Sequence, residues 1–157
     1  MPDVSSDSLA SKDEMSASHL LAICRDGEQF YIHAADSVES YSIKSALQQM
    51  ALARREMLQE VTTHLELQGY DCNQPSAESD NMNHWYHEAI NQVWDFTDMT
   101  VLEKLRTLEA DNLQLLIKRT RTASDKHTRE LMANVAARFQ LCLDLLDAII
   151  TKQQNRC

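Results

Sequence analysis

Four charged side chains fall at positions where the helical periodicity of the sequence predicts a buried face. Glu109 lies inside a leucine-rich stripe, and Arg54 lies near the middle of a methionine-rich one. Glu60 lies towards the edge of the stripe that holds Arg54, and Glu28 lies on the apolar side of an earlier helical pattern. An unpaired charge in a protein core costs several kcal/mol, so we expect these groups to find one another.

One chemistry for this set is a buried network of ion pairs and hydrogen bonds. Arg54 would then pair with Glu109 and with Glu28 or Glu60, and Asn112, which also lies inside the apolar arc, would join them. A network of this kind can fix the register of packed helices even where it adds little stability.

The other chemistry is a carboxylate-bridged iron or manganese site with Glu28, Glu60, His64 and Glu109 as ligands. Di-iron bundles place one Glu on each of two helices and a Glu-x-x-His pair on each of the other two. Here the histidine after Glu60 comes one position late, and the last helical pattern carries no such pair. Arg54 would also bring positive charge to the place that a cation needs. The sequence therefore favours the network, and the metal site stays as the alternative.

An aromatic segment offers a different kind of site. Trp85, Tyr86 and Trp94 lie on a short helical pattern at 81–96 and are a possible patch for a protein partner. They are equally compatible with a face that seals this segment onto the rest of the fold. We find no Ser-His-Asp set, phosphate loop or cysteine nucleophile with a neighbouring base, so the sequence does not predict an enzyme.

The elements that must position these residues are all helical. Apolar residues recur at three- and four-residue spacing over 17–39, 43–68, 100–122 and 125–152, with the short pattern at 81–96 between the second and third. The chain has only 2 Gly and 2 Pro, too few for the frequent turns of a sheet protein. A hairpin, a crossover and a second hairpin is the connectivity of a ferritin-like four-helix bundle. We therefore predict an all-α bundle of this type, with a short crossover helix between the second and third long helices.

Length and charge limit the remaining choices. The 157 residues suit a single domain at 17–153, and the Ser- and Asp-rich stretch at 1–16 is typical of a disordered tail. A net charge of −9 disfavours binding to nucleic acid and to anionic membranes, and no segment is apolar enough to span a bilayer. Two cysteines on apolar faces, Cys24 and Cys142, and a start with no signal-peptide pattern together predict a cytoplasmic protein.

Several short motifs occur in an order that resembles a known family. The motifs are Arg25–Glu28 followed by Ala34–Ala35, then Arg54 and Glu60 before Leu67–Gly69, then His87, Leu102–Glu103 and Glu109. They look like the corresponding segments of an uncharacterised bacterial family of ferritin-like four-helix bundles, known only as a domain of unknown function. The resemblance covers roughly residues 20 to 116. It implies a ferritin-like fold and implies no activity, because fold alone does not give function.

The functional prediction has two forms. The first is a non-catalytic bundle, without a cofactor, that acts as a homo-oligomer or through a protein partner. The alternative is an iron or manganese protein of ferritin-like type in stress response or metal handling, for which Glu28, Glu60 and Glu109 would supply the carboxylates.

Overall fold

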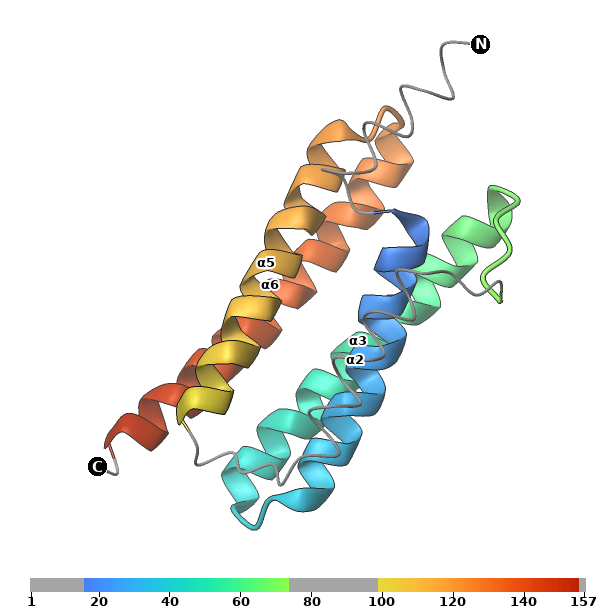
Figure 1. Ribbon diagram of the computed structural model, residues 1–157. Coiled ribbons are helices and arrows are strands. Elements are labelled where there is room, and N and C mark those ends of the chain that lie inside the picture. The colour runs from blue at the N-terminus through green and yellow to red at the C-terminus, as the bar shows by residue number, and fades with distance from the viewer. Residues whose placement is uncertain (1–15, 74–98, 156–157) are drawn as a thin grey trace.

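The computed structural model describes residues 16–73 and 99–155, and these residues form four long helices (Figure 1). They are α2 (Ala17–Ser37), α3 (Tyr41–Leu67), α5 (Met99–Thr122) and α6 (Lys126–Asn155). No strand occurs among the described residues. The predicted all-helical architecture is therefore confirmed for this part of the chain.

Short polar side chains set the helix boundaries. The hydroxyl of Ser16 accepts a hydrogen bond from the backbone N–H of His19 over 3.0 Å and so caps the start of α2. Asp125 caps α6 in the same way, because its carboxylate accepts from the N–H of Thr128 over 3.0 Å. At the end of α3, Gly69 adopts φ 86°, a left-handed conformation that glycine enters without a steric penalty.

The four helices form two antiparallel hairpins that lie side by side. In Figure 1, α2 and α3 make one hairpin, and α5 and α6 make the other. Helix α3 packs against α6 across the bundle. Helices α3 and α5 run in the same direction, so α3 ends and α5 begins at opposite ends of the bundle (Figure 1).

The core lies along the axis between the hairpins and draws on all four helices. Its members are mostly Leu, Ile, Met, Val and Phe at the inward positions that the periodicity predicted. Fully buried side chains from the four helices include Ile23, Phe30, Leu47, Met57, Leu102, Leu116, Val135, Phe139 and Leu146. Arg54 has the largest side chain among the fully buried residues.

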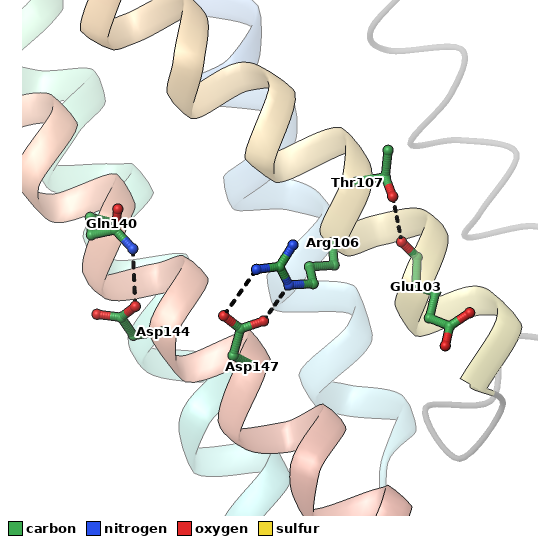
Figure 2. Close-up of polar contacts among 6 residues, drawn as sticks. All are labelled: Glu103, Arg106, Thr107, Gln140, Asp144 and Asp147. Atoms are coloured by element: carbon green, nitrogen blue, oxygen red, sulfur yellow. Dashed lines mark hydrogen bonds and ion pairs between the residues drawn. The ribbon is translucent and has the colours of Figure 1, made fainter.

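The α5–α6 hairpin also carries polar contacts on its exposed surface (Figure 2). Arg106 on α5 donates to both carboxylate oxygens of Asp147 on α6, from Nε over 2.5 Å and from Nη2 over 3.4 Å. Within α6, Gln140 donates to Asp144 over 3.0 Å, and within α5, Thr107 donates to the backbone carbonyl of Glu103 over 3.0 Å. Both members of the Arg106–Asp147 pair are more than 40% exposed, so this pair adds little to stability.

Two predicted segments lie outside the described residues. These are most of the tail predicted at 1–16 and the crossover helix predicted at 81–96. None of the described helices is both long and apolar enough to cross a membrane.

Candidate functional site

Arg54 is the centre of the candidate site. It lies on α3 between Met50 and Met57, and the helical period turns all three side chains towards the bundle axis. Its side chain has no solvent exposure at all. Because arginine stays charged under all ordinary conditions, the core must supply a counter-charge and hydrogen-bond acceptors.

Two helices supply those acceptors. From α2, the backbone carbonyl of Ile23 accepts from Arg54 Nη1 over 2.9 Å. From α5, the carboxylate of Glu109 accepts from Arg54 Nη2, and its side chain is only 2% exposed. The same carboxylate oxygen accepts a second hydrogen bond from the Tyr31 hydroxyl over 3.0 Å. The guanidinium thus joins the backbone of α2 to a side chain of α5.

Two aromatic rings lie next to the guanidinium. The central carbon of Arg54 lies 4.3 Å from the centre of the Phe139 ring and 5.4 Å from the centre of the Tyr31 ring. These distances are within the range of cation–π attraction, which is stronger at a site without water. Since Phe139 belongs to α6, the cluster touches all four helices.

Gly27 makes room for this arrangement on α2. A Cβ atom built at this position would overlap Arg54 Nη1 and would lie 3.1 Å from the central guanidinium carbon. The guanidinium cannot easily move aside, because Ile23 and Glu109 hold it from two directions. Any side chain at position 27 therefore conflicts with Arg54 in its present place.

The structure does not bring all the predicted network residues together. Asn112 is buried, and its Nδ2 has no hydrogen-bond partner among the described residues. Glu28 lies 3.9 Å from Arg55 Nε at the surface, and Glu60 pairs with Nη2 of Arg138 over 2.8 Å with 36% of its side chain exposed. The expectation that Glu28 or Glu60 pairs with Arg54 is corrected, because the ion-pair contacts of these two glutamates are with Arg55 and Arg138.

His64 lies at the end of α3, apart from Glu109. Its Nε2 is 3.2 Å from the Thr128 hydroxyl, and its ring centre is 5.6 Å from that of His127 on α6. Burial, followed by the neighbouring His127, lowers the pKa of His64 from its ordinary value. The shift favours the neutral form of this histidine, which lies where α3 meets α6.

These positions do not fit the predicted metal site. The four candidate ligands, Glu28, Glu60, His64 and Glu109, face four different partners. Within the described ranges, no group of three or more His, Cys, Asp or Glu side chains is placed to hold a metal ion. At Glu109, the cation that meets the carboxylate is a guanidinium.

Three cysteines are buried as free thiols: Cys24, Cys72 and Cys142. Burial raises the pKa of Cys24 to about 12, against the opposing effect of the nearby Arg54. Burial also raises the pKa of Cys142 and of Cys72. None of the three thiols is therefore activated as a nucleophile.

The aromatic patch predicted at Trp85, Tyr86 and Trp94 falls outside the described residues. Among the members of the Arg54 cluster, Gly27 and Tyr31 were not predicted as site residues, although Gly27 lies within the Arg25–Glu28 motif. Both lie in the apolar stripe of the first helix, where a small residue and an aromatic ring are ordinary core members. One feature of the sequence could have indicated Gly27. A glycine inside a helix lowers helix stability by about 1 kcal/mol relative to alanine, so its presence there suggests that a neighbouring group needs the space.

Comparison with known proteins finds no family model, no curated protein and no solved structure that matches this chain.

Proposed function

We propose that the chain is a bacterial, cytoplasmic protein of ferritin-like bundle type. It is non-catalytic and acts by self-association or by binding a protein partner. One observation carries this proposal. The guanidinium of Arg54 meets the carboxylate of Glu109 in the core, where a ferritin-like metal site would require a bound cation.

The surroundings of this pair support the same conclusion. Tyr31 and the Ile23 carbonyl occupy further hydrogen-bonding positions, and two aromatic rings lie next to the guanidinium. A substrate or a water molecule would have to displace groups that already bond to one another. The interior is therefore suited to holding the helices together, which leaves the outer faces to carry the function.

Two measurements on the full chain test the proposal. Light scattering after size-exclusion chromatography gives the oligomeric state, and a pull-down from cell extract tests for a partner recovered in stoichiometric amount. We expect an oligomer or a retained partner. A strict monomer that retains no partner would contradict the proposal.

The competing iron or manganese hypothesis needs its own experiment. The chain is expressed with added iron and manganese, and its metal content is compared with that of a Glu109→Gln variant. We expect no stoichiometric metal in either protein. A metal that is bound stoichiometrically by the natural chain and lost in Glu109→Gln would support the competing hypothesis instead.

A further inference from the structure

Two histidines lie next to each other where α3 meets the start of α6. His64 belongs to the last turn of α3, and His127 is the second residue of α6. The centres of their rings are 5.6 Å apart, and the ring planes are inclined by 44°. In Figure 1 the end of α3 and the turn between α5 and α6 lie at the same end of the bundle. The pair therefore joins one helical hairpin to the other.

A chain of hydrogen bonds fixes which nitrogen of His64 carries its proton. Thr128 donates its hydroxyl hydrogen to the carboxylate of Asp125 over 2.8 Å, because a carboxylate can only accept. The same hydroxyl oxygen is 3.2 Å from Nε2 of His64. Since its one hydrogen is already used, the oxygen accepts and the Nε2–H of His64 donates. The proton that His64 gains in acid therefore goes to Nδ1 and leaves the bond to Thr128 in place.

The charged groups around His64 come from α3, from α5 and from the start of α6. Burial comes first, then His127 and the more weakly acting Arg119 of α5, in lowering the pKa of His64, whereas Asp125 raises it. On α3 itself, Glu60 lies one turn before His64 and is engaged in an ion pair. A drop from pH 7.5 to 5.0 covers the range in which histidine side chains ordinarily gain a proton. At the lower pH, the single carboxylate of Asp125 faces two imidazolium rings and cannot balance both.

Repulsion between the two charged rings is large enough to measure. Two unit charges 5.6 Å apart and screened as in water repel by an energy equivalent to about a threefold change in an equilibrium constant. Screening is weaker where protein replaces part of the water, and His64 is only partly exposed. Because the bond to Thr128 survives protonation, charge alone favours separation of α3 and α6 at this end.

The middle of the bundle is held by groups that do not titrate with histidine. Arg54, which joins α3 to α2 and α5, lies ten residues before His64, or about 15 Å along the helix. Arginine keeps its charge throughout this pH range. Helix ends also open at a lower free energy than the core does. Protonation should therefore loosen the end at His64 while the packing around Arg54 persists.

We propose that His64 and His127 form a pH-sensitive latch between the two hairpins. With both rings neutral the latch is closed, and the end of α3 packs against the start of α6. With both rings protonated, their repulsion opens this end while the middle of the bundle stays folded. The latch acts within one chain, so it holds or fails independently of the proposed function.

The first test is an NMR titration of the full chain, in which the imidazole C–H signals report the pKa of each histidine. His127→Gln removes one charge beside His64 and should raise the pKa of His64. His33→Gln is the matched control, because His33 is exposed four residues before the end of α2, at the opposite end of the bundle. It should leave the titration of His64 unchanged. An unchanged pKa of His64 in His127→Gln would overturn the proposal.

Hydrogen exchange read by mass spectrometry tests the opening itself. Protection factors at pH 7.5 and 5.0 correct for the intrinsic pH dependence of exchange. At the lower pH, protection at 61–67 and 129–135 should fall about threefold or more relative to 47–57 in the middle of α3. His64→Gln and His127→Gln should each reduce this fall, and His33→Gln should keep it. Glutamine at position 64 can still donate to Thr128 but cannot carry a charge.

Each remaining outcome also decides the matter. Equal protection at the two pH values, or a fall of the same size in all three variants, would overturn the latch. A fall spread evenly over the four helices would mean a global loss of stability and would overturn it as well. Far-UV circular dichroism at pH 7.5 checks the fold of each variant. If His64→Gln does not fold, the exposed His127→Gln gives the deciding comparison.

Discussion

Replacing Arg54 by methionine removes the guanidinium while keeping an unbranched side chain in the core. The carboxylate of Glu109 then remains buried with the Tyr31 hydroxyl as its hydrogen-bond donor among the contacts described above. Breaking a buried ion pair from one side costs about 3–5 kcal/mol, because the remaining charge stays desolvated. We therefore expect a loss of this size in the free energy of unfolding, measured by urea denaturation with far-UV circular dichroism.

The chain offers a matched control in the Arg106–Asp147 pair. Arg106→Met removes the same functional group from an ion pair that solvent reaches on both sides, and should cost at most about 1 kcal/mol. The comparison isolates burial as the cause, since the substitution is chemically identical. Equal losses in Arg54→Met and Arg106→Met would refute the reasoning.

A double variant tests the coupling between the partners. Arg54→Met combined with Glu109→Leu removes both charges and the hydrogen bond from the Tyr31 hydroxyl to Glu109, at a cost of about 1–3 kcal/mol. The double variant should thus lose less stability than either single one, with a coupling energy of about 3 kcal/mol or more. Additive losses would mean that the two side chains act independently.

Three further predictions follow from the same contacts. Gly27→Ala should lower the free energy of unfolding by about 1–3 kcal/mol through overlap with Arg54, and the gain of about 1 kcal/mol that helix propensity alone predicts would contradict this. Since the pKa of Cys24 is raised to about 12, iodoacetamide at pH 8 should modify it only after unfolding in urea. Peptide mass spectrometry measures the extent of modification, and equal rates of modification in the native and the unfolded chain would be evidence against burial of the thiol. The pKa of His64 is lowered in the folded state, so the unfolded chain binds the proton more readily and stability should fall as the pH drops below about 6.5. The fall should be smaller in His64→Gln, as urea midpoints at pH 7.5 and 5.5 will show, and identical pH profiles would exclude this histidine as the cause.

The helices could be predicted because periodicity and caps are local properties. The predicted range 17–39 begins where α2 begins and ends two residues after it, and the range 43–68 differs from α3 by two residues at its start and one at its end. The same periodicity placed Arg54 and Glu109 on buried faces, where the structure has them. Each of these inferences needs only the angle of a residue around its own helix.

Pairing of Arg54 with Glu109 was expected from the sequence, but a second acidic partner could not be chosen. Periodicity gives no information on how one helix is rotated or shifted against another, so Glu28 and Glu60 were equivalent candidates for it. The structure places Glu60 against Arg138 and Glu28 3.9 Å from Arg55 Nε. Gly27 was overlooked for the same reason, since its role depends on a side chain that arrives from another helix.

The buried cluster and an exposed leucine lie on opposite sides of α3. Arg54 and Leu52 are two residues apart, about 200° around α3, so one points into the core while the other is exposed. A shift of α3 by one turn, about 5.4 Å, would separate Arg54 from both the Ile23 carbonyl and Glu109 and so break the buried ion pair. Apolar contacts alone would oppose such a shift less strongly, because one leucine or methionine can replace another. The ion pair therefore fixes the register of α3, and that register places Leu52 and Leu141 in one groove between α3 and α6.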